Sequence, residues 1–355
     1  MNRITAAMAV AGTALALALS SGSVLAADTD QQTTDPAKKY HFQKRADGSE
    51  WAETPWGRLG VARLATAPFP DDTRTTGFVS KRGTFPFAGH YDDNRVAIAV
   101  PRQLVGRPVR RVDLIVHFHG HLNECLRAVE QFQLGDQLAA SGCHAVLVVP
   151  QGPKDVPDSS GGKLEKPGAF AAFVDELQGV LEKSGALASP KVEIRNIVLS
   201  GHSGAYRVMA RILDVGGKWD QIREVWLFDA AYGNLDELAL PGTAPASERK
   251  HLRSIFTDHL ATENSQIMSR LYLAGARPAI VYDDLLTTGG TTAREAPAAE
   301  GALRKVRTPH ASLEEILKAE PWLFIYTSLA HNDVIAARRY FERFARSSPF
   351  LEKAR

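Results

Sequence analysis

The six residues from 200 to 205, Ser-Gly-His-Ser-Gly-Ala, hold the clearest candidate for covalent chemistry in this chain. An apolar run typical of a buried strand precedes the motif, and a helical pattern follows it. A strand-to-helix turn this sharp has room only for small side chains beside a nucleophile, and it lifts the serine above the carboxyl edge of the sheet. The usual pattern is G-x-S-x-G, from which Ala205 departs by a small-for-small change. The motif predicts that Ser203 is a nucleophile.

A nucleophilic serine needs a general base on another loop at the same edge of the sheet, later in the chain. His331 lies just past the last predicted strand and directly before a predicted final helix. His259 and His310 are weaker candidates, and His310 lies in a polar loop before that last strand. We therefore expect His331 to be the base.

The acid that orients the base is left open between two aspartates. Asp229 ends the strand predicted at residues 225 to 228, and Asp258 follows the strand predicted at 252 to 256. Both would face the same sheet edge as Ser203. The small residues after Asp229 favour it slightly, because they allow close approach of another loop.

Backbone donors for a developing oxyanion are expected on two loops. Gly204, directly after the nucleophile, supplies one N–H, and the second normally comes from the loop after an earlier strand. Here His119, Gly120 and His121 occupy that loop. These residues are the predicted oxyanion and substrate-binding positions.

Two other classes of protein compete with the serine mechanism. His117, His119 and His121 alternate along a predicted strand end, so three imidazoles on one side are a candidate zinc site for a metal hydrolase. Metal-binding motifs of this kind usually include an acidic residue, whereas position 120 is glycine. This difference favours the serine mechanism over a zinc site. A non-catalytic binding protein on the same scaffold is the third class, since a fold does not establish an activity.

The elements that must position these residues follow from the apolar pattern. Short apolar runs, mostly continuous as in parallel strands buried on both faces, lie at residues 60–64, 95–100, 112–118, 145–150, 196–200, 225–228, 252–256 and 322–326. Helix-like stretches lie between many of them, at 123–140, 168–183, 205–213, 264–274 and 332–346. The alternation predicts an α/β fold with a doubly wound, mostly parallel sheet, and the first two runs predict antiparallel strands at its N-terminal edge.

The ends and loops of the chain complete the predicted organisation. Residues 1–27 carry Arg3, an apolar run and a small-residue cleavage pattern, which together indicate a secretory signal peptide. Residues 28–50 are polar and predict a flexible leader, and residues 51–355 predict one domain. Within it, the segments near 234–250 and 285–311 are rich in Gly, Thr, Pro and Ala and predict loop insertions.

Composition excludes several partners. Lys plus Arg number 42 against 40 for Asp plus Glu, so nothing points to a nucleic acid. No second apolar run is long enough to span a membrane, so no integral membrane association is expected after signal cleavage. Export permits a disulfide between Cys125 and Cys143, but one continuous helix between them would hold them apart unless Gly135 breaks it.

The order of residues 112–120, residues 201–205 and His331 resembles the α/β-hydrolase superfamily over residues 90 to 348. More narrowly, Tyr-Asp-Asp at 91–93 and His-Phe-His-Gly at 117–120 resemble bacterial secreted esterases of the polyhydroxyalkanoate-depolymerase and feruloyl-esterase kind. The resemblance implies a secreted or periplasmic serine hydrolase with a Ser-His-Asp triad and an acyl-enzyme, acting on a small or polymeric carboxylic ester. It implies no cofactor and no metal. A serine amidase or peptidase would use the same machinery, and remains an alternative.

Overall fold

The computed structural model describes residues 39–283, 304–305 and 312–354. The chain divides into two units at Thr34 and Asp35, and the described residues all belong to the second unit. The predicted signal peptide, the first part of the leader and nearly all of the segment near 285–311 lie outside these residues. Within the described ranges, no helix combines the length and the hydropathy needed to cross a membrane.

A twelve-stranded sheet forms the centre of the fold, in the order β1-β2-β3-β6-β8-β7-β9-β10-β11-β14-β12-β13. Its strands are β1 (Gln43–Lys44), β2 (Glu50–Thr54), β3 (Gly57–Arg63), β6 (Arg95–Pro101), β7 (Arg111–Phe118), β8 (Ala145–Pro150), β9 (Glu193–His202), β10 (Ile222–Phe228), β11 (His251–Phe256), β12 (Ala279–Tyr282), β13 (Arg304–Lys305) and β14 (Trp322–Tyr326). Neighbours from β1 to β8 pair antiparallel, and those from β8 to β13 pair parallel. The predicted doubly wound sheet with an antiparallel N-terminal edge is confirmed, and the arrangement is the α/β-hydrolase fold.

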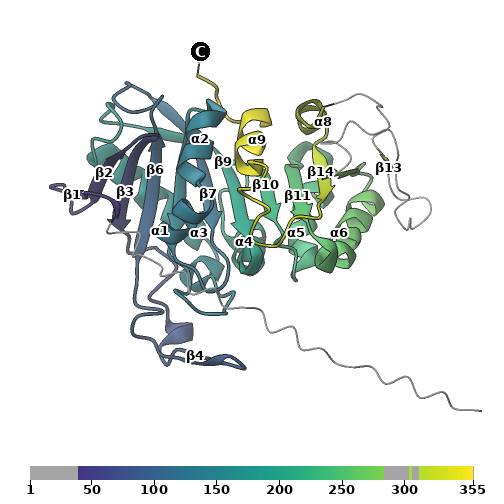
Figure 1. Ribbon diagram of the computed structural model, residues 1–355, viewed down its shortest axis with the longest axis horizontal. Helices are drawn as coiled ribbons and strands as arrows, with labels where there is room; N and C mark the ends of the chain where they lie inside the picture. The colour runs from purple at the N-terminus through teal and green to yellow at the C-terminus, as the bar shows by residue number, and fades with distance from the viewer. Residues whose placement is uncertain (1–38, 284–303, 306–311, 355) are drawn as a thin grey trace, which may run out of the picture. The chain divides into compact units, whose positions relative to one another are not determined.

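Helices cover both faces of this sheet (Figure 1). They are α1 (Cys125–Gln131), α2 (Leu134–Ser141), α3 (Ala169–Lys183), α4 (Tyr206–Val215), α5 (Leu235–Thr243), α6 (Ala261–Leu273), α8 (Leu313–Ala319) and α9 (Tyr340–Ser347). One core joins apolar side chains of α3, α4, α5 and α6 to one face, with Phe170 and Met209 among them. A second core joins α1, α2, α8 and α9 to the other face, with Leu138 and Phe341 among them. The near-continuous apolar runs of the strands are explained by these two cores.

The segment near 234–250 is not the loop insertion that its composition predicted. Residues 235–243 form α5, which packs between α4 and α6. Gly242 is required there, because a Cβ at this position would lie 2.6 Å from Leu271 of α6. The small residues therefore permit close helix packing, whereas the sequence pattern indicated chain flexibility.

Two further boundaries differ from the expected ones. The predicted leader ended near residue 50, but β1 lies inside it and pairs with β2 at the sheet edge. The final helix begins at Tyr340, after Arg339 with φ of 53°, and not directly after His331. The first difference arises in a polar segment that carries no periodic signal. The second arises because residues 332–339 form turns although Val334 and Ile335 are buried, and the left-handed Arg339 separates these turns from the helix.

Cys125 and Cys143 are both buried and unbridged. The helix expected between them is broken, so that α1 ends at Gln131 and α2 starts at Leu134. The break falls at Gln133, whose φ is 50°, and not at Gly135. Gly135 serves packing instead, because a Cβ there would lie 2.4 Å from the Trp56 ring.

Candidate active site

Ser203 stands on the turn between β9 and α4, with a backbone φ of 54°. This left-handed conformation is unusual for a residue with a side chain, and it marks the sharp turn that the motif predicts. Gly201 makes the turn possible, because a Cβ there would lie 2.4 Å from Sδ of Met209 and 2.7 Å from Cβ of Ala205. The methyl group of Ala205 is itself buried, so its departure from the usual glycine is accommodated.

His331 follows β14 and lies against the aspartate at the end of β10. Its Nδ1 is 2.6 Å from Oδ2 of Asp229. Burial alone would raise the pKa of Asp229, but hydrogen bonds from His331 and Thr257 outweigh it and hold that pKa below its ordinary value. Because the carboxylate accepts, Nδ1 of His331 carries the proton and donates, which leaves Nε2 free to accept one.

The two candidate acids are thereby separated. Asp229 is fully buried, and it accepts hydrogen bonds from the backbone N–H of Thr257 at 2.9 Å and from the hydroxyl of Thr257. Asp258 is exposed in the following turn, where its carboxylate accepts a hydrogen bond from Tyr326 at 3.4 Å. The structure therefore brings Asp229, and not Asp258, to His331.

The loop after β7 packs directly on the Ser203 turn. A Cβ at Gly120 would lie 2.8 Å from Cβ of Ser203, and one at Gly204 would lie 2.3 Å from the His121 ring. Both glycines are therefore needed for this contact. His121 also bonds through Nε2 to the hydroxyl of Ser159, at 2.8 Å. The predicted oxyanion residues thus lie beside the predicted nucleophile.

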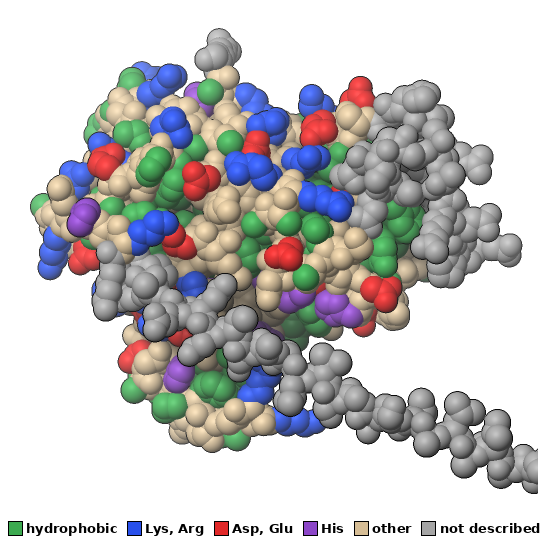
Figure 2. Space-filling model, in the orientation of Figure 1, with side chains coloured by type: hydrophobic (Ala, Val, Ile, Leu, Met, Phe, Trp, Pro, Cys, Tyr) green, Lys and Arg blue, Asp and Glu red, His purple; other side chains and the backbone are tan. Residues whose placement is uncertain are grey.

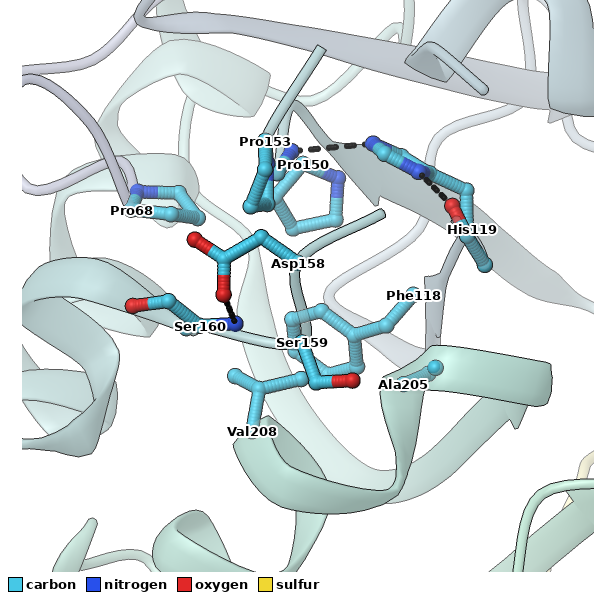
Figure 3. A pocket seen from close by; sticks show the side chains of 14 residues that line it. Pro68, Phe118, His119, Pro150, Pro153, Asp158, Ser159, Ser160, Ala205 and Val208 are labelled. Carbon is cyan, nitrogen blue, oxygen red and sulfur yellow. Dashed lines mark hydrogen bonds between the residues drawn. The ribbon is translucent and has the colours of Figure 1, made fainter. Parts of the chain in front are cut away.

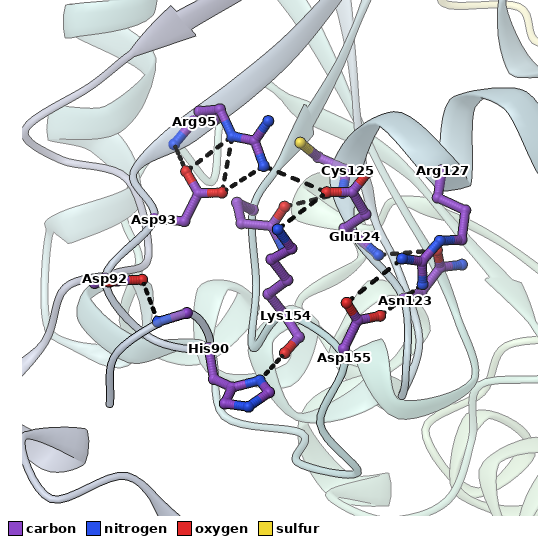
Figure 4. A network of polar contacts seen from close by, with 12 residues as sticks. His90, Asp92, Asp93, Arg95, Asn123, Glu124, Cys125, Arg127, Lys154 and Asp155 are labelled. Atoms are coloured by element: carbon purple, nitrogen blue, oxygen red, sulfur yellow. Dashed lines mark hydrogen bonds and ion pairs between the residues drawn. The ribbon is translucent and has the colours of Figure 1, made fainter. Parts of the chain in front are cut away.

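A network of charged side chains surrounds the start of α1, directly after this loop (Figure 4). Glu124, directly before α1, forms ion pairs with Arg95 at 3.3 Å and with Lys154 at 3.8 Å. Arg127, in the first turn of α1, forms an ion pair with Asp155 at 2.6 Å. Since the buried Glu124 is only three positions from His121, the network fixes the start of α1 and with it the preceding loop.

The three alternating histidines do not converge on a metal position. Nδ1 of His117 bonds to the hydroxyl of Ser200 at 2.8 Å, inside an aromatic core. His119 donates from Nδ1 to the Gly120 carbonyl at 2.9 Å, and its Nε2 accepts the N–H of Gly152 at 3.0 Å. His121 turns to Ser159. Burial lowers the pKa of His117 to about 3 and that of His119 to about 4, so both are neutral structural side chains.

His202, which sequence reasoning passed over, lies directly under the candidate base. Its Nε2–H donates to the carbonyl of His331 at 3.1 Å, and the two rings lie 4.7 Å apart. Burial lowers the pKa of His202 to about 4, which keeps it neutral. His202 occupies the variable position before Ser203 in the motif, and that adjacency was the only signal in the sequence.

Tyr232, which the sequence did not single out, and His259, a weaker candidate for the base, form a second group beside Ser203. The Tyr232 hydroxyl bonds to Nε2 of His259 at 2.7 Å, and the tyrosine also contacts the Ser203 hydroxyl. Burial raises the pKa of Tyr232 to about 12, so it remains a phenol at neutral pH. Nδ1 of His259 lies 2.6 Å from the Thr257 hydroxyl, which in turn bonds to Asp229.

An open cleft of about 740 Å³ contains these groups. Its lining is mostly polar and includes Arg82 of the hairpin formed by β4 (Phe78–Ser80) and β5 (Gly83–Phe85), together with His121, Leu122, Asn123, Gln131, Phe132, Ser159, His202, Ser203, Gly204, Tyr206, Tyr232, His331 and Asn332. Figure 2 shows a few histidine side chains close together near the lower edge of the molecule in that view. Ser203 and His331 therefore share one solvent-accessible space.

A small cavity of about 20 Å³ (Figure 3) is lined in part by Gly204, which also lines the large cleft. Phe118, Ala205 and Val208 line it from the sheet and α4, and Ser159 belongs to both spaces. This volume is enough for a single water molecule. The large cleft is therefore the only one of the two that admits a substrate.

Comparisons with known proteins give similarities to solved structures only. No protein-family model matches the sequence, and no curated protein matches it. Among solved structures it is similar to a feruloyl esterase module from Clostridium thermocellum, with 9% identity, a TM-score of 0.46, and coverage of 85% of this chain and 92% of that one. It is also similar to an S-formylglutathione hydrolase from Agrobacterium tumefaciens, with 13% identity, a TM-score of 0.39, and coverage of 84% and 98%.

Proposed function

We propose that this chain is a serine hydrolase that cleaves carboxylic esters through an acyl-enzyme. The observation that carries the proposal is the 2.6 Å contact between His331 and the buried Asp229, at the cleft that also exposes Ser203 on its left-handed turn. A base oriented by an ionised acid beside a serine on such a turn is the arrangement that nucleophilic acyl transfer needs.

The chemistry follows from the proton positions. Oγ of Ser203 attacks the acyl carbon while Nε2 of His331 takes its proton, and Asp229 stabilises the imidazolium. Backbone N–H groups of Gly204 and of the Gly120–His121 loop stabilise the negative charge on the carbonyl oxygen. His331 returns the proton to the departing alcohol. A water molecule, activated by the same base, then hydrolyses the acyl-enzyme. No metal or cofactor has a part in these steps.

The N-terminal 27 residues support export of this enzyme to the periplasm or the medium. The substrate would then be an extracellular or periplasmic ester, either small or polymeric. The open, polar lining of the cleft fits a leaving group that carries hydroxyl or other polar substituents.

The test is hydrolysis of p-nitrophenyl esters, from acetate to octanoate, by residues 28–355 and by the Ser203→Ala variant. We expect the substitution to lower kcat by at least about a thousandfold while the fold is retained. Ser159→Ala, which alters another serine of the same cleft, is the matched control and should keep covalent labelling by a fluorophosphonate. Retained hydrolysis in Ser203→Ala would contradict the mechanism. Serine-dependent labelling without ester turnover would instead indicate an amidase or peptidase.

A further inference from the structure

A second histidine stands at the carboxylate of Asp229. Nε2 of His259 lies 3.6 Å from the same Oδ2 atom that is 2.6 Å from Nδ1 of His331. The three side chains come from the carboxyl ends of β10, β11 and β14, which are neighbours in the sheet. One donor atom from each lies within 4.8 Å of the other two, and the described residues contain no other such group of His, Cys, Asp or Glu.

Two imidazoles and one carboxylate are a donor set that suits Zn²⁺. Zinc ligand bonds of about 2.1 Å place the donor atoms of a tetrahedral site about 3.4 Å apart. The separation between His259 and Asp229 already matches this value, and the His331 contact must open by less than an ångström. The carboxylate is buried, whereas the side chains of His259 and His331 are 48% and 30% exposed. An ion can therefore enter from solvent and keep water at its fourth position.

The hydrogen bonds around His259 also present the correct nitrogen. Nδ1–H donates to the Thr257 hydroxyl, whose own proton is directed to Asp229. Nε2 is consequently the unprotonated nitrogen, and it accepts the Tyr232 hydroxyl at 2.7 Å. Zinc binding therefore displaces only the neutral Tyr232 hydroxyl from Nε2 of His259. The hydrogen bond to Thr257 orients the His259 ring, as an outer-shell partner does in metal sites.

We propose that Asp229, His259 and His331 form an inhibitory binding site for Zn²⁺ or a similar transition-metal cation. Coordination through Nδ1 of His331 requires that its proton move to Nε2, so the imidazole changes tautomer without a net change in charge. In that tautomer Nε2 is a donor and does not accept the Ser203 proton. The metal therefore blocks general-base catalysis reversibly. The inhibitory part rests on the proposed serine mechanism, whereas the binding part does not.

Binding is tested first on the Ser203→Ala variant, by equilibrium dialysis and calorimetric titration with ZnCl₂, so that the readout does not depend on activity. We expect one Zn²⁺ per chain at this site. His259→Gln in the same background should weaken binding at least about tenfold, since it removes a direct ligand. His41→Gln, which alters an exposed histidine outside the cluster, should leave the affinity unchanged. Equal affinity in His259→Gln, or no binding at all, would overturn the site.

Inhibition is tested on the enzyme with Ser203 intact. Zn²⁺ should lower p-nitrophenyl ester turnover, EDTA should restore it, and Mg²⁺ should have no effect because it prefers oxygen ligands. His259→Gln should need at least about ten times more Zn²⁺ for half-inhibition, measured relative to its own uninhibited rate. Zinc binding without inhibition, or activation by zinc, would overturn the proposed consequence. If no ester is turned over, dialysis still decides whether the site exists.

Discussion

At the scale of single residues, protonation states organise the site. His117, His119 and His202 are buried and neutral, and each has a fixed hydrogen-bond partner. His331 is partly exposed and faces an ionised carboxylate. Of these four imidazoles, His331 alone combines access to the cleft with an acid that stabilises its cation. Function is thus assigned to one histidine among several by its surroundings and not by its position in a motif.

The first residue-scale prediction separates the two aspartates. Asp229→Asn removes the acceptor that keeps the proton on Nδ1 of His331, so kcat for p-nitrophenyl acetate should fall by about 10³- to 10⁴-fold. Asp258→Asn is the matched control, because Asp258 is exposed and bonds only weakly to Tyr326 at 3.4 Å. Its kcat should stay within about threefold of the wild-type value, as for most exposed substitutions. The opposite order of the two variants would assign the acid to the later strand.

At the scale of elements, the turn between β9 and α4 depends on the absence of a side chain at Gly201. Sδ of Met209 and Cβ of Ala205 occupy the space that a methyl group there would need. The strand, the turn and the first residues of α4 therefore pack as one unit. A change in this packing is expected to displace Ser203 as well as to destabilise the domain.

Two glycine-to-alanine substitutions test whether the packing at Gly201 controls both the position of Ser203 and the stability of the domain. Gly201→Ala should lower the free energy of unfolding by about 1–3 kcal/mol, as overpacking does, and should also lower kcat. Gly179→Ala, in the middle of α3, meets no atom within 4 Å and should raise the free energy of unfolding by about 0.5–1 kcal/mol, with kcat unchanged. Urea denaturation and ester turnover measure both variants. A neutral Gly201→Ala would show that the turn relaxes more easily than its contacts indicate.

The strands were predicted well where burial on both faces gives a continuous apolar run in the sequence. The apolar runs at 112–118 and 225–228 became β7 and β10, and the motif around Ser203 placed its turn correctly. Helix α5 was missed because Pro241 and Gly242 are loop formers in isolation, although both are buried here. The sequence favoured Asp229 over Asp258 only slightly, since the choice depends on the distance between strand ends in space. The position of His259 beside Asp229 could not be predicted for the same reason.

At the scale of the whole molecule, the buried histidines link stability to pH. The imidazoles of His117, His119 and His202 titrate near 6.5 in the unfolded chain, whereas burial lowers their pKa values in the fold to about 3, 4 and 4. Between these limits the unfolded state binds more protons than the folded state. The free energy of unfolding must therefore fall as the pH decreases through this range.

We expect full stability above pH 6.5 and a progressive loss between pH 6.5 and 4 of up to about 3 kcal/mol for each of the three imidazoles, because one unit of pKa difference corresponds to about 1.4 kcal/mol. Urea denaturation at half-unit intervals of pH measures this. In the His117→Asn variant, which removes one of the three titrating groups, the slope in this range should be shallower than in wild type. A free energy of unfolding that stays constant down to pH 4 would contradict the burial of neutral imidazoles.

The left-handed backbone of Ser203 has a consequence for protein engineering. A side chain in this conformation costs roughly 1–2 kcal/mol, whereas glycine adopts it without penalty. A redesign procedure that rewards only thermal tolerance will therefore favour glycine at position 203. The resulting enzyme would resist heat better and have lost the hydroxyl on which turnover is proposed to depend. Any stabilised variant of this chain should thus be selected with position 203 held constant.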